Sequence, residues 1–250
     1  MRIAIALLAF ALVGQTLSLI VPGAAVAADA LSAAQKDEVK KLVREYILEN
    51  PSIISEAINA LEAQADKIKI DKRASVMLSR RQELLNPTEG TVLGNPKGDV
   101  TVVEFFDYNC GYCKSMFPAV VELLKEDPKL RLVMKEYPIL GPSSLTAARA
   151  ALAARKQGKW SELHMALMAY KGQVSDSVVM VVAQNIGLDT KKLQEDMKDP
   201  SLNDILSKNH SLADDLAIDG TPQLIVEGNF LPGAVPKSDL VDAIAQARKK

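Results

Sequence analysis

The segment VVEFFDYNCGYCK, residues 102–114, holds the two cysteines of this 250-residue chain, Cys110 and Cys113. A β-branched and aromatic run, typical of a buried strand, leads directly into a stretch with the pattern of a helix. Two thiols separated by two residues can form a structural disulfide, half of a metal site or a redox couple. The rest of the chain distinguishes between these three possibilities.

The composition is that of a soluble globular protein. Hydrophobic residues make up 48% of the chain and charged residues 24%, and the length suits one or two domains. Lys and Arg number 30 and Asp and Glu 31, so the formal net charge is -1. Because a nucleic-acid surface needs an excess of basic residues, we expect no nucleic-acid partner.

The N-terminus has the pattern of a signal peptide over residues 1–27. Arg2 supplies a basic start, residues 3–21 are mostly apolar, and Ala25-Val26-Ala27 fits the small-x-small cleavage rule. The alternative is an uncleaved membrane anchor, but polar residues interrupt the apolar run and no basic cluster follows it. We therefore expect cleavage near Ala27 and export to an oxidising compartment.

Residues 28–88 are predicted to form a helical oligomerisation arm and a linker. Ser32 and Gln35 form a capping box, and Asn50-Pro51 ends one helix and starts the next. Apolar residues of the second helix recur at steps of four and three, as in a short coiled coil. The alternative is an amphipathic helix that folds back on its own domain. The residues of this apolar seam are Ile54, Ile58, Leu61, Ala65 and Ile68.

The chain from residue 89 to residue 250 has the pattern of an α/β domain. A strand, a helix and a second strand follow one another as a βαβ unit, whose crossover is expected to be right-handed. A long helical block then separates this unit from a β-hairpin and a last helix. The expected elements are a strand at 100–106, a helix at 111–126, a strand at 130–138, helices over 143–219, a tight turn at Gly228-Asn229 and a helix at 238–248.

The position of the two thiols favours redox chemistry. A thiol at the start of a helix is stabilised as a thiolate by unpaired backbone N–H groups and the helix dipole. Cys110 is thus expected to be an exposed nucleophile and Cys113, one turn later, a resolving thiol. A zinc site needs further ligands, and His164 and His210 are isolated on helical patterns. A disulfide closing so short a loop would stabilise the fold little.

Three stretches of the chain resemble the DsbA-like thioredoxin-fold family, and within it the exported ScsC and Com1-type branch of periplasmic disulfide isomerases. They are GNPKGDVTVVEFFDYNCGYC (94–113), KEYPILGPSS (135–144) and GTPQLIV (220–226). The resemblance implies a thioredoxin fold with a helical domain inserted at about 143–219. It also implies that Pro222 is cis and that the Thr221 backbone lies beside Cys110, where it pairs with a client.

The resemblance further suggests roles for three residues around the thiols. Glu104 matches a buried acid that assists proton transfer in relatives, although an ordinary carboxylate at a strand end is an equal alternative. Gly111 and Tyr112, which should face the substrate, replace the Pro-His of strongly oxidising members. Without that histidine, the pKa of Cys110 should be less depressed and the pair a milder oxidant.

The sequence thus predicts an oligomeric protein disulfide isomerase of the periplasm, a homotrimer or a homodimer, acting on misfolded or reduced exported proteins. A membrane thiol reductase of the ScsB or DsbD type would keep it reduced. The redox-active Cys110–Cys113 pair is the expected reaction centre, without a metal or other cofactor. One alternative is a DsbA-like oxidase that donates its disulfide, and another is a copper-binding protein of copper tolerance, because thiolate pairs suit Cu(I).

Overall fold

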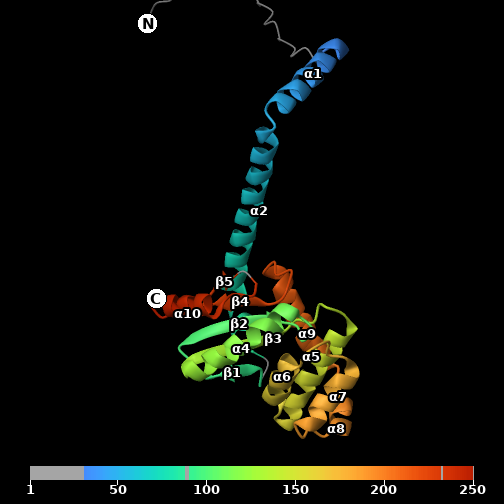
Figure 1. The fold of residues 1–250 in the computed structure, drawn as a ribbon, viewed down its shortest axis with the longest axis vertical. Helices are drawn as coiled ribbons and strands as arrows, with labels where there is room; N and C mark the ends of the chain where they lie inside the picture. Colours follow the sequence, from blue (N-terminus) through green and yellow to red (C-terminus); the bar gives the residue numbers. More distant parts are fainter. Residues whose placement is uncertain (1–30, 88–89, 232, 250) are drawn as a thin grey trace, which may run out of the picture. The chain divides into compact units, whose positions relative to one another are not determined.

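The computed structural model describes residues 31–87, 90–231 and 233–249, and the predicted signal peptide lies outside them. The chain divides into two compact units between Ala60 and Leu61. The first unit consists of α1 and the beginning of α2, and the second contains the sheet and the remaining helices (Figure 1). Each unit is described separately below.

Helices α1 (Ala33–Glu49) and α2 (Ser52–Ser79) form on either side of Asn50-Pro51, as predicted. The side chain of Ser32 accepts a hydrogen bond from the N–H of Gln35, and Gln35 accepts one from the N–H of Ser32. No residue of α1 is buried, and the seam residues of α2 are also exposed. Two amphipathic helices therefore present apolar side chains to solvent in the isolated chain.

The second unit contains a mixed sheet of the described strands in the order β1-β3-β2-β4-β5. The predicted βαβ unit is present as β2, α4 and β3, with β2 and β3 parallel. The other neighbouring strands pair antiparallel. The strands are β1 (Val92–Gly94), β2 (Val100–Phe106), β3 (Leu130–Glu136), β4 (Gln223–Val226) and β5 (Asn229–Leu231), and α4 spans Gly111–Glu126.

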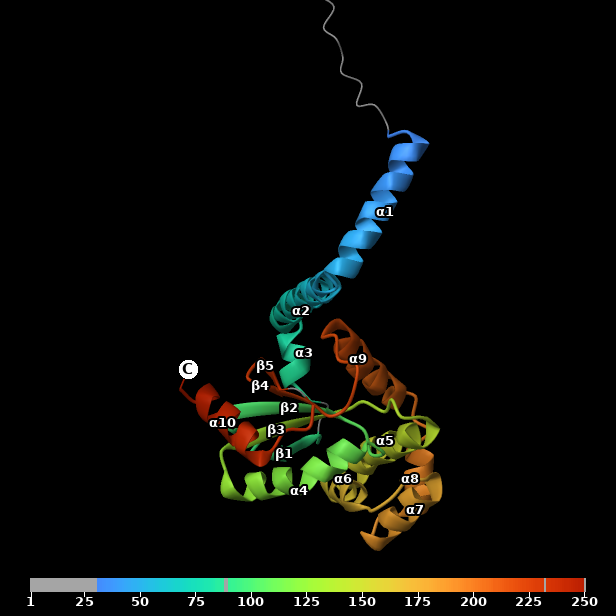
Figure 2. The same cartoon turned by 45° about the horizontal axis from the view of Figure 1, so that its top comes forward.

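Helices cover both faces of the sheet. Successive side chains of β2 point to opposite faces, so they belong to two different cores. Val102 and Phe106 belong to the larger core, which includes α4 and α10 (Lys237–Ala247). Val103 and Phe105 belong to a second core formed with α3 (Arg81–Leu85) and α9 (Ser201–Asp215). Figure 2 shows α3 and α9 on the face of the sheet opposite α4.

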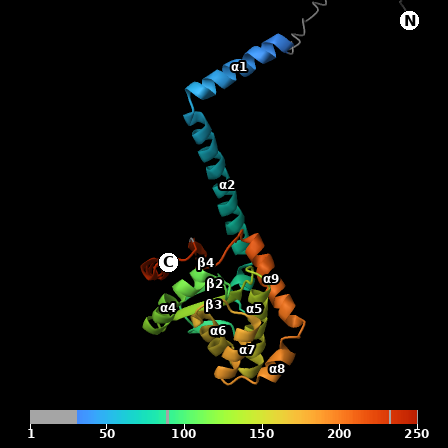
Figure 3. The ribbon, with the colours of Figure 1, turned by 45° about the vertical axis from the view of Figure 1, so that its right-hand side comes forward.

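The predicted helical insertion follows β3 and returns to the sheet at β4. Apart from α9, its helices gather beyond one end of the sheet (Figure 3). α5 is their centre, because its alanines are buried and let its neighbours approach closely. The insertion consists of α5 (Pro142–Ala154), a short 3-10 turn at Arg155–Gln157, α6 (Trp160–Ala169), α7 (Asp176–Asn185), α8 (Thr190–Asp196) and α9.

Two details differ from the sequence prediction. The hairpin turn comprises Glu227 and Gly228, both with positive φ, whereas Asn229 already pairs with Val226 in the sheet. The compact unit also begins well before the predicted boundary at residues 88–89. Leu84 is only 1% exposed, in the core with β2 and β3, so α3 belongs to the second unit rather than to a linker.

Candidate active site

Cys110 is the N-cap of α4, directly after the loop that follows β2. Its Sγ accepts a hydrogen bond from the N–H of Cys113 at 3.3 Å and donates one to the carbonyl oxygen of Thr221 at 3.1 Å. Both cysteines are in the free thiol form. The structure therefore brings together the two sequence-predicted segments, which are 111 residues apart.

Most hydrogen bonds around Cys110 favour its thiolate, whereas the bond that its thiol donates to the Thr221 carbonyl favours the protonated form. The largest effect is a hydrogen bond from the Cys113 thiol, with further bonds from the Thr221 side chain and from backbone N–H groups. Together they outweigh burial and lower the pKa of Cys110 to about 6. This depression occurs without a histidine in the motif, so helix-terminal and thiol donors replace the missing imidazole.

Cys113 has the opposite electrostatic character. Its hydrogen bond to Cys110, its burial and the nearby Glu104 carboxylate all raise its pKa. One thiol of the pair is thus ionised at neutral pH and the other remains protonated. This division is what a nucleophile and a resolving thiol require.

The exposure of Cys110 differs from the sequence prediction. Its residue is only 4% exposed, because the backbone of the Thr221 loop covers the sulfur that we expected to be open. Tyr112 is 72% exposed instead, and a side chain added at Gly111 would meet open space. The two central residues of the motif thus form the accessible surface next to the thiol.

The Thr221–Pro222 bond is cis, as the resemblance implies. It directly precedes β4, whose Leu224 pairs with Glu104 of β2. The sheet therefore places the Thr221 carbonyl beside the N-terminus of α4.

Glu104 is a buried acid rather than a carboxylate at a solvated strand end. Its residue is 3% exposed, and alternation along β2 directs its side chain to the face covered by α4. Burial raises the pKa of Glu104 to about 8, and the negative charge of Cys110 contributes to this rise. An acid with a pKa near neutrality, next to Cys113, can exchange protons with that thiol.

Two polar residues of the active-site loop were missed in the sequence. The carboxylate of Asp107 accepts hydrogen bonds from the N–H groups of Asn109, Ile139 and Leu140 at 2.7–2.9 Å. The side-chain amide of Asn109 donates a hydrogen bond to the carbonyl of Val174 and accepts one from its N–H. An Asx turn before the helix was the available signal, but the distant partners were not visible in the sequence.

Neither histidine belongs to the site. His164 is buried in the core, stacked on Trp160, with its Nδ1 3.1 Å from the Tyr108 hydroxyl. Burial lowers its pKa to about 3, so it is neutral. His210 is exposed and lies 3.3 Å from Asp214. Within the described part of the chain, no three His, Cys, Asp or Glu residues are grouped so that they could hold a metal.

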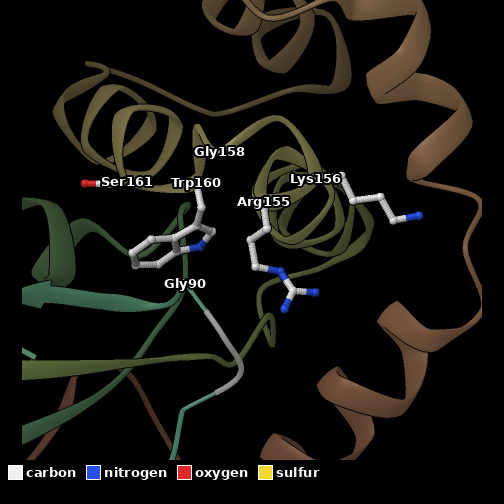
Figure 4. Close-up of a pocket in the computed structure, with 6 residues that line it drawn as sticks. All are labelled: Gly90, Arg155, Lys156, Gly158, Trp160 and Ser161. Atoms are coloured by element: carbon white, nitrogen blue, oxygen red, sulfur yellow. The ribbon is translucent and has the colours of Figure 1, made fainter.

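A separate cavity of about 520 Å³ lies beside Trp160, far along the chain from the thiols. Figure 4 shows the indole and the side chains of Arg155 and Lys156 at this cavity. The ammonium of Lys156 forms ion pairs with Asp196 and Asp199. These ion pairs link the 3-10 turn after α5 to the end of α8 and the residues that follow it. None of the predicted site residues lines this cavity.

Comparison with known proteins places this site in a family. Residues 101–245 match the DSBA-like thioredoxin domain. The chain belongs to this family of DsbA-like thiol–disulfide oxidoreductases. Residues 35–67, which include most of α1 and the first part of α2, match the N-terminal domain of the copper resistance protein ScsC. The family suggested by the sequence resemblance and the predicted thioredoxin fold are therefore confirmed.

Solved structures of DsbA-like proteins support the assignment. A thioredoxin-like oxidoreductase from Silicibacter pomeroyi is 48% identical, with a TM-score of 0.65, covering 68% of this chain and 98% of that one. ScsC from Proteus mirabilis, in a transitional conformation, is 29% identical, with a TM-score of 0.63, covering 87% of this chain and 97% of that one. The second match covers a larger share of this chain than the first.

The curated relatives include much longer proteins. The Na⁺/H⁺ antiporter NhaA 1 of Salinispora arenicola is 31% identical over 165 residues, or 65% of this chain. The match spans only 25% of that antiporter. No helix within residues 31–87, 90–231 and 233–249 has the length and apolar character needed to cross a membrane.

Proposed function

We propose that this protein is a periplasmic disulfide isomerase that uses Cys110 as nucleophile and Cys113 as resolving thiol. The observation that carries the proposal is the position of the Cys110 sulfur, bonded to the N-terminus of α4 on one side and to the cis-proline loop on the other. A thiolate in this place can attack a disulfide of a client strand that pairs with Thr221.

The first step exchanges one disulfide for another. The Cys110 thiolate attacks a client sulfur, the client S–S bond breaks, and a Cys110–client disulfide forms as a client thiolate leaves. In isomerisation, this client thiolate attacks a second client disulfide and frees another client thiolate. The newly freed thiolate attacks the client sulfur of the Cys110–client disulfide, which forms a new client disulfide and releases Cys110 as thiolate. The net result is a reshuffled client and an unchanged enzyme, so no external oxidant is consumed.

Cys113 can resolve the Cys110–client disulfide when the client does not rearrange. Once Cys110 is in a mixed disulfide, its negative charge is gone, and the pKa of the nearby Glu104 should fall. The Glu104 carboxylate can then accept the Cys113 proton. The new thiolate attacks Cys110, which forms the Cys110–Cys113 disulfide and releases a reduced client. A membrane thiol reductase of the ScsB or DsbD type would return the pair to dithiol.

The N-terminal helices support isomerisation over simple disulfide donation. The seam residues Ile58 and Leu61 are 49% and 66% exposed, although a heptad seam normally packs against a second helix. Self-association through this seam, as a homotrimer or homodimer, would present several Cys110 thiolates to one client. The resulting high local thiol concentration favours repeated attack.

Location and clients follow from the same proposal. A periplasmic thioredoxin-like protein of Salmonella enterica shares the fold, at 27% identity and a TM-score of 0.58. The predicted signal peptide at residues 1–27 agrees with that compartment. Clients would be misfolded or reduced exported proteins whose chains expose cysteines.

The decisive experiment separates self-association from chemistry. The variant Ile58→Glu places a charge in the seam, and Asn59→Glu places the same charge at an adjacent exposed position outside it. Both full-length proteins are compared with wild type in refolding scrambled ribonuclease and in mass measured on the same samples. We expect Ile58→Glu alone to be monomeric and to lose isomerase activity while retaining thiol–disulfide exchange with a small peptide.

Two results would redirect the assignment. If the monomeric Ile58→Glu variant refolds scrambled ribonuclease as well as wild type, the role of the arm in isomerisation is wrong. If Cys110 and Cys113 are fully oxidised in the cell envelope, the DsbA-like oxidase is favoured instead.

A copper function is the second candidate, supported by the match of residues 35–67 to a domain of copper resistance proteins. The free Cys110 and Cys113 thiols are suitable Cu(I) ligands. Stoichiometric, tight Cu(I) uptake by the reduced protein, together with an absence of thiol–disulfide exchange, would favour this candidate over the isomerase.

A further inference from the structure

The chain reaches the cis-proline loop through an unusual turn at the end of α9. Leu216 caps the helix, and Ala217 follows with φ of 50°, in the left-handed region. The N–H of Ile218 bonds to the carbonyl of Ala213, and the N–H of Ala217 to that of Asp214. This hydrogen-bond pattern is that of a Schellman motif, in which glycine is the usual residue at the left-handed position. Alanine there costs about 1 kcal/mol.

Arg73 of α2 holds this turn from outside. Its Nε donates to the carbonyl of Leu216 at 2.9 Å and its Nη2 to the carbonyl of Ala217 at 3.2 Å. The guanidinium also lies over the ring of Phe230, 4.1 Å from its centroid. A planar fork with two bonds and a stacking partner has one preferred position. Arg73 therefore fixes the direction in which the chain leaves α9.

Two further contacts hold the next residues. The hydroxyl of Tyr137 donates to the carbonyl of Ile218 at 3.3 Å. The ammonium of Lys69, one turn before Arg73 in α2, lies 3.6 Å from the carboxylate of Asp219. Only Gly220 then separates this held segment from Thr221. Displacement of the turn would therefore be passed directly to the loop that contacts Cys110.

We propose that Arg73 is a positioning residue of the active site, which sets the cis-proline loop against Cys110 through the Leu216–Ala217 turn. The inference rests on the proposed redox role of Cys110. It gives α2 a second task besides self-association, because the same helix carries the seam and the anchor of the loop. Deletion of the whole arm would remove both tasks at once.

The test uses full-length protein and four variants. Arg73→Ala removes the anchor, and Arg73→Lys keeps the charge without the fork. Arg80→Ala is the matched control, because Arg80 also joins the N-terminal helices to α9 but bonds Ser211 and Asp215 in the helix body. In the double variant Arg73→Ala with Ala217→Gly, glycine removes the backbone cost and protects folding. The readout is the pKa of Cys110, measured by thiolate absorbance at 240 nm.

The Thr221 side chain supports the Cys110 thiolate, so Arg73→Ala should raise the pKa of Cys110 by about half a unit or more. The double variant should show the same rise with restored stability, and Arg73→Lys an intermediate one. Arg80→Ala should leave the pKa within about 0.2 units. A double variant with the wild-type pKa, or equal shifts in Arg73→Ala and Arg80→Ala, would overturn the inference. A wild-type pKa near 8.5 would instead overturn the proposed function.

Discussion

The depressed pKa of Cys110 predicts that the reduced protein gains stability as pH rises from 5 to 8. In the folded dithiol form the pKa is about 6, against the ordinary value of 9.0. A group whose pKa is lowered by folding stabilises the fold above its unfolded pKa, and this contribution is lost as pH falls through the folded pKa. The disulfide form has no Cys110 ionisation. The reduced form should therefore gain stability relative to the oxidised form.

The size of the effect follows from the pKa difference. Each unit corresponds to about 1.4 kcal/mol, so the full separation of the two pKa values would give about 4 kcal/mol at high pH. Between pH 5 and pH 8 the linkage relation yields about 2.5 kcal/mol, with a slope of about 1.2 kcal/mol per pH unit between pH 7 and pH 8. Above pH 8, Cys113 would begin to ionise in the unfolded chain but not in the folded one, because folding raises its pKa. This ionisation lowers the stability of the reduced protein and opposes the Cys110 effect.

The assay is urea unfolding of reduced and oxidised protein at half-unit steps from pH 5 to 8. Glu104 has a raised pKa, so its ionisation destabilises the fold over the same range and opposes the Cys110 effect. The measurement is therefore made in a Glu104→Gln background, with Cys110→Ser added in a control. The reasoning fails if the reduced-minus-oxidised difference changes by less than about 0.5 kcal/mol, or if the free energy of unfolding of the Cys110→Ser control, which has only a reduced form, rises equally with pH.

Further predictions concern single side chains. Thr221→Val should raise the pKa of Cys110, because a hydrogen bond to the thiolate is lost, and an unchanged thiolate absorbance titration would contradict this. Leu84→Ala should lower the free energy of unfolding by about 3 kcal/mol, whereas a change under about 1 kcal/mol would place α3 outside the core. Asn109→Ala should cost about 2 kcal/mol in urea unfolding, since its amide bonds Val174, and a neutral result would refute this anchoring role. Glu104→Gln should slow release of a mixed disulfide in stopped-flow measurements; equal rates would exclude a proton-transfer role.

Short-range patterns in the sequence determined the elements around the thiols. The apolar run at residues 100–106 makes a strand, the polar turn ends it, and Cys110 starts α4, because each choice depends on neighbours within about one helical turn. The capping box at Ser32 and the exposed seam of α2 are local in the same sense. The roles of Thr221 and Glu104 came from resemblance to a family, not from the pattern alone.

Tertiary structure decided what lies next to these elements. The burial of Leu84, and with it the start of the catalytic unit, depends on strands that follow later in the chain. The partners of Asp107, and the bonds from Arg73 to Leu216 and Ala217, join segments about 30 to 140 residues apart. Periodicity and capping describe only nearby residues, whereas burial and hydrogen bonding between distant segments arise when the sheet and helices pack together. The sequence therefore determined where the reactive thiols are, and the packed fold decided how strongly each one holds its proton.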